Sequence, residues 1–457
     1  MAEICLTYLN YEQVKAIPTD PSPNLHHTPF LEYCSLYWGV HAKEELSQCA
    51  KSLALELFRG YDGHISAQLL SRQVDHLYLE DSGRASPLSG LHCVSFFGIA
   101  ELVAAFIEME CYDINGGYFG GYTPLSWAAR NGHQQVVEIL LERGEINPDK
   151  PNDNGETPLW GAAENGHQGV VKMLLRREEV NPDKADNYGR TPLLHATWDG
   201  REGVVKILLR RGEVCPDKQC DTGQTPLSYA AQRGHEEVVK ILLGGEEINP
   251  DWPDDRGQTP LSYAAEYGHE GVAKVLLGRE EVNLDRPTNL GRTPLSLAAE
   301  NGHEGVVKIL LGRQEVNPNK PDKCGQTPLW CAARSRREGI VKILLGREDV
   351  DPDRPDFWGQ APLSIAAQAG CEAVVKILLQ RAEVSLNRPD KFGQTPFLLA
   401  AREGREAVVK VLLGQKGVNA SRPDNRGETP LMHATGRRHK RVVALLQSHQ
   451  GVTGRAA

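Results

Sequence analysis

Short apolar runs alternate with polar, proline-rich segments along most of the chain. In residues 223–257, one apolar face at helical spacing consists of Leu227, Ala230 and Ala231. Gly234 ends this run, and after His235 comes a second apolar set, Val238, Val239, Ile241, Leu242 and Leu243. Residues 247–257 are then rich in the turn formers Pro, Asp and Gly. The pattern predicts a helix, a turn, a second helix and an extended finger.

The same pattern recurs every 34 residues. Thr-Pro-Leu begins at Thr123, Thr157, Thr191, Thr225, Thr259, Thr293, Thr327 and Thr429. Ala361-Pro-Leu and Thr395-Pro-Phe fill the two gaps, so there are ten units, each with a Gly two residues before the motif. A degenerate eleventh unit precedes them, because Ser89-Gly90-Leu91 lies 34 residues before Thr123-Pro124-Leu125.

Each motif has a physical role within the unit. Thr caps a helix by accepting a hydrogen bond from a free backbone N–H, and Pro suits the first helical position. Gly ends a helix because it tolerates the left-handed conformation. Two short helices cannot bury their apolar face alone, so the units must stack. The sequence therefore predicts an all-α solenoid of about eleven helix-turn-helix-finger units, preceded by a small helical segment.

The consensus Gly-x-Thr-Pro-Leu-x-x-Ala-Ala-x-x-Gly-His-x-x-Val-Val-x-x-Leu-Leu resembles the ankyrin repeat. It departs from that family in its 34-residue period, in a longer finger that reads Asn-Pro-Asp-x-Pro-Asp, and in lacking the His that commonly follows Thr-Pro-Leu. The resemblance implies a non-enzymatic scaffold that binds a protein partner on a concave face made by fingers and first helices. We expect the stack to survive the three departures.

Residues 1–84 lack the period and are predicted to form a helical head, followed by the degenerate unit at 85–120 and the ten repeats at 121–457. Residues 18–29 are predicted to be a proline-broken connection. Candidate core positions of the head are Phe30, Leu31, Leu36, Tyr37, Val40, Leu46, Leu53, Leu55, Leu57 and Phe58.

The head also carries a second resemblance. Cys5-Leu-Thr-Tyr-Leu together with residues 29–42 resembles the segment that joins a NACHT nucleotide-binding module to ankyrin repeats in fungal NLR-like (STAND) ATPases. Such a module needs Gly-x-x-x-x-Gly-Lys-[Ser/Thr], and neither Gly-Lys-Ser nor Gly-Lys-Thr occurs in the sequence. The alternative function is therefore the C-terminal sensor arm of a larger or truncated NLR-like signalling protein, involved in self/non-self recognition.

Composition and charge limit the kinds of partner and the cellular environment that the chain suits. The chain has 45 Gly and 28 Pro, and the repeats explain this excess because each contains several of both. The net charge is −9, so we expect no nucleic-acid partner. No apolar stretch reaches the ~20 residues that span a bilayer, and residues 1–10 show no secretory signal. The ten cysteines are scattered and include no Cys-x-x-Cys, so we expect reduced thiols in an intracellular, cytoplasmic environment and no structural metal.

Three recurring polar features invite chemical hypotheses. His133, His167, His235, His269 and His303 recur once per repeat, but stacked helices lie ~8–10 Å apart, too far for a shared zinc ion. The finger carboxylates Asp149, Asp183, Asp217, Asp251 and Asp353 offer too few oxygens for calcium and suit turns. Seven Glu–Lys pairs at i,i+4, from Glu202–Lys206 to Glu406–Lys410, predict salt bridges on a solvated helix face. No catalytic, cofactor or metal site is predicted.

The basic run Arg437–Arg441 has two interpretations. It could act as a nuclear-import or phosphate-binding patch, or it could form the polar outer face of a unit that caps the stack. Gln447 stands where earlier units have the second Leu of Leu-Leu, and this favours capping.

Binding positions are sought where scaffold positions leave residues free to vary. These are the two residues before each finger Gly and the two residues after Ala-Ala. Binding energy concentrates in Trp, Tyr and Arg, so the candidates for protein binding are Tyr188, Trp198, Arg233, Tyr267, Arg334, Phe357, Trp358 and Phe392. The alternative for each aromatic residue is packing on a neighbouring finger. We expect a monomer unless the head oligomerises.

The units that begin at 325 and 359 are the predicted weak point of the stack. Arg336, Arg337 and Cys371 break their Gly-His pattern, and Ala361 replaces the capping Thr.

Overall fold

The computed structural model describes residues 1–17, 29–43, 46–61, 64–70, 89–109, 112–118, 120–245 and 248–453. The described residues form helices and no strand, with one isolated bridge between Tyr118 and Tyr122. None of these helices is both long and apolar enough to cross a membrane. The chain divides into two compact units, Met1–Pro226 and Leu227–Ala457.

The head belongs to the first unit. It contains α1 (Ala2–Leu9), α2 (Glu12–Lys15), α3 (Pro29–Ala42) and α4 (Gln48–Phe58), and α1 packs on both α3 and α4. Two helices follow, α6 (Gly90–Phe97) and α7 (Ala100–Glu108), in the span predicted to be the degenerate unit. Trp38 joins the two parts, because its ring centroid lies 4.9 Å from that of Phe58 and 5.3 Å from that of Phe97. The head and the degenerate unit therefore share one core.

The predicted core of the head is partly wrong. Leu31, Leu57 and Phe58 are buried, but Phe30, Tyr37 and Val40 are exposed. Helix α3 is apolar on all sides, so its periodicity does not select the inward face; the structure turns Leu31, Cys34 and Trp38 inward. The predicted connection at 18–28 and residues 71–88 lie outside the described residues.

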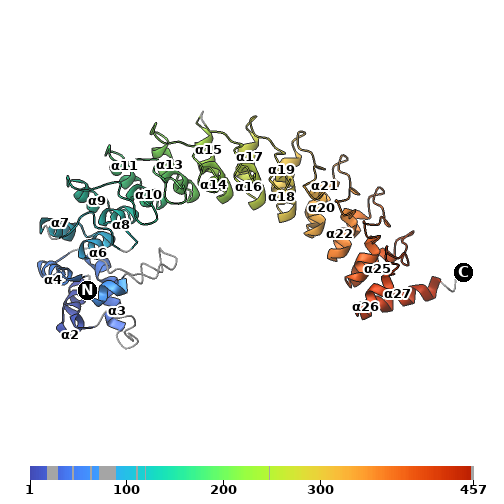
Figure 1. Ribbon diagram of the computed structural model, residues 1–457, viewed down its shortest axis with the longest axis horizontal. Helices are drawn as coiled ribbons and strands as arrows, with labels where there is room; N and C mark the ends of the chain where they lie inside the picture. Colours follow the sequence, from blue (N-terminus) through green and yellow to red (C-terminus); the bar gives the residue numbers. More distant parts are fainter. Residues whose placement is uncertain are drawn as a thin grey trace. The chain divides into compact units, whose positions relative to one another are not determined.

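Each later repeat has a first and a second helix, and each type forms its own layer within a unit (Figure 1). The first unit continues with α8 (Pro124–Arg130), α9 (Gln134–Leu141), α10 (Pro158–Glu164), α11 (Gln168–Leu174), α12 (Pro192–Trp198) and α13 (Glu202–Leu208). Helix α14 (Pro226–Arg233) begins at the boundary.

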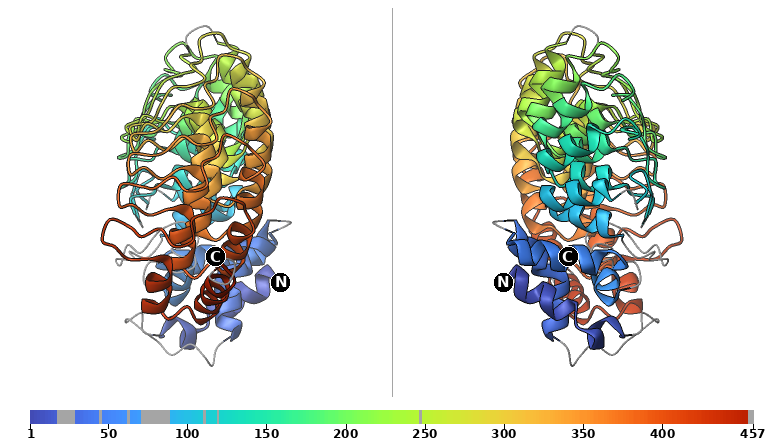
Figure 2. Two further views of the ribbon diagram at one scale, coloured as in Figure 1. Left: turned by 90° about the vertical axis from the view of Figure 1, so that its right-hand side faces the viewer. Right: turned by 90° about the vertical axis from the view of Figure 1, so that its left-hand side faces the viewer.

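The second unit has α15 (Glu236–Leu243) and then first helices α16 (Pro260–Tyr267), α18 (Pro294–Asn301), α20 (Pro328–Arg334), α22 (Pro362–Ala369), α24 (Pro396–Arg402) and α26 (Pro430–Gly436). Its further second helices are α17 (Glu270–Leu277), α19 (Glu304–Leu311), α21 (Glu338–Leu345), α23 (Glu372–Leu378), α25 (Glu406–Leu413) and α27 (Lys440–Thr453). In each unit the fingers project to one side of the helices (Figure 2).

The helix ends are fixed by the residues that the sequence singled out. Eight Thr side chains accept a hydrogen bond from the backbone N–H three residues later, at 3.1–3.3 Å. Ala361 makes no such cap. Where Gly ends a first helix it is left-handed, for example Gly268 at φ 81°, and Arg336 and Arg438 adopt φ 59° and 61° at the same position without being Gly. Arg336 therefore carries a backbone conformation that side chains disfavour.

The recurring histidines join neighbouring repeats. His133, His167, His269, His303 and His439 each donate a hydrogen bond from Nε2 to the carbonyl at the end of the preceding first helix, at 2.8–3.0 Å. Arg201, Arg337 and Arg405 donate the same bond from Nε. Arg337 therefore restores a contact that its unit was predicted to lose, but within the described residues Cys371 makes no equivalent bond. The four recurring histidines with these bonds thus make the polar contacts near the helix ends that the structural interpretation expects.

The finger carboxylates hold the next finger. Lys184 donates from Nζ to the backbone oxygen of Asp149 at 2.8 Å and lies 3.0 Å from its carboxylate, and Lys218 does the same to Asp183. Arg286 repeats the contact with Asp251 in the second unit. Burial raises the pKa of Asp149 and Asp251 in spite of these basic partners. The carboxylates thus serve packing between fingers.

The predicted Glu–Lys pairs form only in part. Glu236–Lys240, Glu372–Lys376 and Glu406–Lys410 are in contact, at 2.5–2.7 Å, and in the described residues the other four pairs are not. The side chain of Glu270 instead lies over Gly305 of the next repeat, and Glu304 lies over Gly339. The nine cysteines that the structure describes are free thiols.

Candidate protein-binding surface

The eight predicted binding residues occupy two kinds of position. Tyr188, Phe357, Trp358 and Phe392 stand at fingertips and are all exposed. Arg233, Tyr267 and Arg334 stand at the ends of first helices and are exposed as well, whereas Trp198 at the end of α12 is half-buried. Tyr188 and Trp198 belong to the first unit and the other six to the second.

The fingertips of the second unit form a continuous row, called the tip row below. It consists of the two residues before each finger Gly, at 255–256, 289–290, 323–324, 357–358, 391–392 and 425–426. One backbone hydrogen bond of 2.8–3.0 Å joins each tip to the next, for example from Lys391 N–H to the carbonyl of Trp358. Each Asp at the base of a finger adds rigidity; Asp356 accepts bonds from the N–H groups of Trp358 and Gln360. The row therefore presents its side chains on a fixed backbone.

The middle of the tip row is apolar and exposed. Leu290, Phe357, Trp358 and Phe392 keep 64%, 60%, 46% and 57% of their surface accessible. Phe357 partly covers the preceding finger, because a Cβ on Gly325 would lie 2.7 Å from its ring. Packing on a neighbouring finger thus buries part of the Phe357 side chain, and most of its surface stays exposed to solvent. The structure brings Phe357, Trp358 and Phe392 together on two adjacent tips.

Arg334 and Tyr267, at the ends of first helices, contact residues of their own unit. The Arg334 guanidinium lies 2.7 Å from Glu300 and 5.5 Å above the ring of Trp330, and Glu300 also pairs with Arg292 at 2.8 Å. Tyr267 accepts a hydrogen bond from Gln232 at 3.3 Å. In the first unit, Arg190 lies 4.7 Å above the ring of Tyr188. These contacts order the side chains and leave them less free for a partner than the tips.

A buried polar cluster in the first unit binds α8, α10 and α12 together. Arg130 pairs with Glu164 at 2.8 Å, and Tyr122 donates a 2.6 Å hydrogen bond to Glu156. Burial raises the pKa of Glu164, although Arg130 opposes the shift. The His195 ring lies tilted by 51° against the Trp160 ring, with centroids 4.1 Å apart, and burial together with nearby Arg190 lowers the pKa of His195 to about 3. These groups face one another inside the unit, so the cluster serves packing.

Asp424, Glu428 and His433 form a cluster with metal-ligand chemistry. His433 Nε2 lies 2.9 Å from Asp424 and 3.3 Å from Glu428. The same contact recurs without metal-ligand chemistry in another repeat, where Tyr263 donates a 2.6 Å hydrogen bond to Asp254 from the position that matches His433. Contact between the first helix and the finger Asp is thus part of the repeat itself, and the cluster is not evidence for a metal site.

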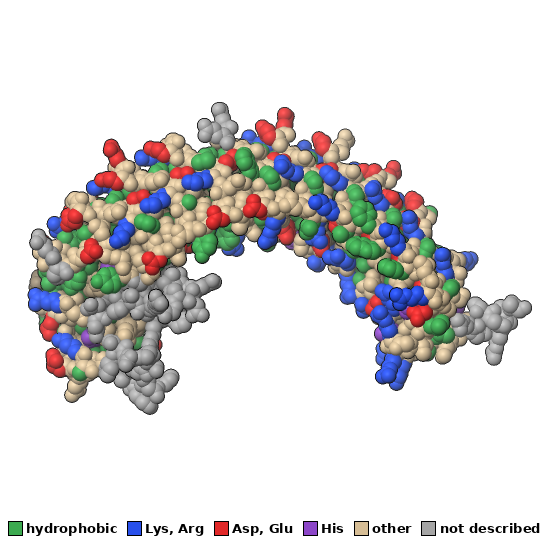
Figure 3. Space-filling model, viewed as in Figure 1, with side chains coloured by type: hydrophobic (Ala, Val, Ile, Leu, Met, Phe, Trp, Pro, Cys, Tyr) green, Lys and Arg blue, Asp and Glu red, His purple; other side chains and the backbone are tan. Residues whose placement is uncertain are grey.

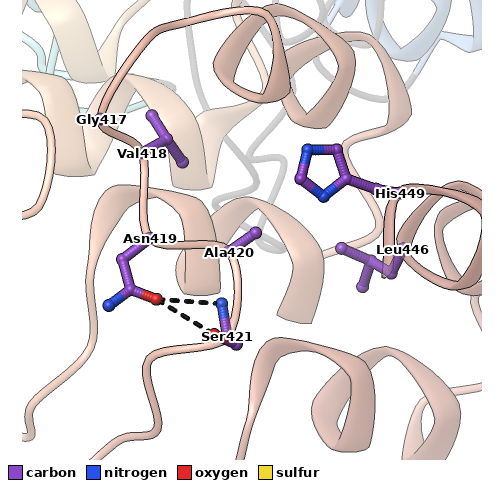
Figure 4. A pocket seen from close by; sticks show the side chains of 7 residues that line it. All are labelled: Gly417, Val418, Asn419, Ala420, Ser421, Leu446 and His449. Carbon is purple, nitrogen blue, oxygen red and sulfur yellow. Dashed lines mark hydrogen bonds between the residues drawn. The ribbon is translucent and has the colours of Figure 1, made fainter. Parts of the chain in front are cut away.

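The last repeat also contains a hollow of about 400 Å³ (Figure 4). Helix α27 contributes Leu446 and His449, and the finger contributes residues 417–421. Two polar residues of the lining are hydrogen-bonded to each other: Asn419 Oδ1 accepts hydrogen bonds from the Ser421 N–H and hydroxyl, both at 3.2 Å. Among the lining residues His449 alone is ionisable, so the hollow offers no pair of groups for acid–base chemistry.

The basic run Arg437–Arg441 contacts the preceding repeat. Arg437 pairs with Glu403 at 2.9 Å, and Arg441 lies 3.6 Å from Glu406. These ion pairs agree with a role in capping the stack, and nuclear import stays a prediction.

Sequence reasoning identified the tip positions but did not choose several of their residues as binding candidates. Leu290, Lys323, Lys391 and Arg426 stand at the same two positions as the aromatic candidates, and all are exposed. The signal was the position itself. The candidates chosen at the tips were all aromatic, and this choice left out the aliphatic and basic residues at the same positions.

Comparison with protein families agrees with the repeated architecture. A family described as ankyrin repeats (3 copies) matches residues 144–219, 213–287, 279–356, 295–390 and 363–455, and the single ankyrin repeat matches residues 120–153. The search of curated proteins gives no match. Together the two family matches cover residues 120–455, well over half of the chain. The chain belongs to the ankyrin-repeat family.

Proposed function

We propose that the chain is a non-enzymatic scaffold that binds a protein partner on the face formed by its fingers and first helices, with the tip row as the main contact. Ankyrin repeats in general suggest protein–protein interaction. The observation that carries the proposal is the set of exposed apolar side chains, Leu290, Phe357, Trp358 and Phe392, on a backbone fixed by hydrogen bonds.

The available energy is large enough for specific binding. Three aromatic side chains that are about half exposed offer roughly 300 Å² to a partner, which corresponds to about 7 kcal/mol of gross hydrophobic free energy. The loss of translational and rotational freedom on association offsets much of this free energy. A rigid backbone keeps the cost of ordering low, so the row is suited to act as a hot spot.

A substitution pair tests the proposal. We expect Trp358→Ala together with Phe392→Ala to reduce quantitative capture of the native partner by at least tenfold, while the melting curve stays unchanged. Trp252→Ala is the matched control, because Trp252 is an exposed aromatic residue of the same unit that does not belong to the tip row. Equal capture by the parent chain and the double variant would refute the role of the row.

The alternative function is the sensor arm of an NLR-like ATPase. The core shared by Trp38, Phe58 and Phe97 supports it, because a head that is continuous with the array suits a segment that joins two modules. A NACHT module encoded in frame upstream of residue 1 would support this alternative. If no such module is encoded there, the alternative fails and the scaffold function is unaffected.

A further inference from the structure

We propose that the partner presents an extended acidic segment with apolar anchors, which lies along the tip row from Arg256 to Arg426. This inference rests on the proposed function and specifies the chemistry of the partner. Its argument has three parts: the charge of the row, the order of its side chains, and the contrast with the first unit.

The tip row is positively charged although the chain carries −9. Its twelve positions include four basic residues, Arg256, Lys323, Lys391 and Arg426, and one acidic residue, Asp255, so the net charge is 4 − 1 = +3. All four basic side chains are exposed, and within the described residues they form no salt bridge. Such charges attract an acidic partner and increase its association rate.

The order of side chains along the row points to an extended peptide. Arg256 and Arg426 stand at the two ends, and the apolar side chains lie between them beside Lys323 and Lys391. Hydrophobic side chains gather near α20–α22 with Lys and Arg next to them (Figure 3). At ~8–10 Å per repeat and ~3.3 Å per extended residue, the partner contributes about three residues per tip and about 14 along the row.

The first unit supplies an internal contrast. Its described tips at 153–154, 187–188 and 221–222 read Asp-Asn, Asn-Tyr and Asp-Thr, with two acidic residues and no basic residue. A segment that binds the tip row through acidic groups is therefore not attracted by these tips. The charge of the fingers assigns the acidic partner to the second unit.

A nucleic acid is the other ligand that combines negative charge with stacking. Binding of a single strand uses a basic groove that follows the phosphates, with aromatic residues between the charges. The row has only four basic side chains over six tips and includes Asp255. A protein segment, which needs fewer charges and uses Leu290 as well as the rings, fits this surface better.

The test measures fluorescence anisotropy of labelled probes with the full chain. The main probe is a 16-residue peptide in which Asp or Glu alternates with Leu or Phe; the matched probes replace the acids by Asn and Gln, replace the apolar residues by Ser, or consist of a 16-nucleotide single-stranded DNA. We expect the acidic–apolar peptide to bind more tightly than all three, with an affinity that falls as salt rises.

Charge reversal locates the site. Lys323→Glu with Lys391→Glu should weaken binding of the acidic–apolar peptide about tenfold. Lys308→Glu with Lys342→Glu is the matched control, because it changes the net charge equally at exposed positions on second helices, and it should leave the affinity within about twofold.

Four results would overturn the inference: no binding of the acidic–apolar peptide, equal binding of the neutral peptide, equal loss in the two double variants, or tighter binding of the oligonucleotide. The proposed function fails separately, when Trp358→Ala with Phe392→Ala leaves capture of the native protein partner unchanged.

Discussion

Replacing Ala361 by Thr should stabilise the second unit by about 2 kcal/mol, by two contributions. The first is the missing side-chain cap of α22, where the N–H of Ser364 donates at 2.9 Å to the backbone oxygen of Ala361 because that residue has no side-chain oxygen. The second concerns the hydroxyl of Ser364, which is buried and has no hydrogen-bond partner in the described residues. In other repeats the capping Thr bonds the Ser at this position, at 3.0 Å for Thr123–Ser126 and 3.1 Å for Thr259–Ser262.

The backbone at Ala361 already has the conformation of a capping Thr. Ala361 has φ −77° and ψ 165°, close to the values at Thr259, φ −93° and ψ 167°. An N-cap hydroxyl contributes about 1 kcal/mol, and a hydrogen bond to a buried orphan hydroxyl contributes about another 1 kcal/mol. The two contributions can be separated, because Ser364→Ala removes the orphan hydroxyl and leaves the cap.

A double-mutant cycle with urea unfolding measures both contributions. Ala361→Thr should add about 2 kcal/mol in the parent chain and about 1 kcal/mol in the Ser364→Ala background, a coupling of about 1 kcal/mol. Hydrogen exchange in α22 checks that the gain is local, since a repeat array can open in parts. A gain below 0.5 kcal/mol in the parent chain would refute the reasoning on the cap, and equal gains in both backgrounds would refute the reasoning on the hydroxyl.

Three further substitutions test other contacts by urea unfolding. Arg336→Gly relieves the left-handed backbone, worth about 1–2 kcal/mol, and removes an exposed hydrogen bond from the guanidinium to the carbonyl of Ala369, worth about 0.5 kcal/mol. We therefore expect a net gain of about 1 kcal/mol, and no gain would contradict the strain. Cys371→His should add about 1 kcal/mol through a bond from Nε2 to the carbonyl of Arg334, and an unchanged midpoint would contradict that bond. His195 stays unprotonated when folded but binds a proton when unfolded below about pH 6.5, so stability falls on acidification. From pH 7 to pH 5 this loss is about 2 kcal/mol, and His195→Leu should remove it; an unchanged pH dependence would contradict the lowered pKa.

The repeats were predictable because their determinants are local. Thr259, Pro260 and Gly268 set the beginning and the end of α16 within a dozen residues, and each unit packs mainly on its neighbours. The head has no such repetition. Helix α3 is apolar all round, so burial of Trp38 and exposure of Tyr37 depend on contacts with α1 and α6, which periodicity alone does not contain.

The candidate surface was predictable by position and less so by residue. The two residues before each finger Gly were identified, and Phe357, Trp358 and Phe392 prove exposed there. The ion pair between Arg334 and Glu300 was not predictable, because the two residues lie 34 positions apart and meet only through stacking. Likewise, the backbone bonds that align the tips come from the stack and leave no mark in the sequence.

Site-specific photo-crosslinking tests the central claim most directly. A photoreactive phenylalanine analogue is placed at Trp358 on the tip row, and in a matched chain at Lys308 on a second helix, and both chains are irradiated in the native cell. We predict a discrete crosslinked protein from position 358 and none from position 308, with the crosslink in an acidic segment of the partner. Crosslinking to a discrete partner from position 308, with none from position 358, would contradict the claim that the tip row is the binding surface.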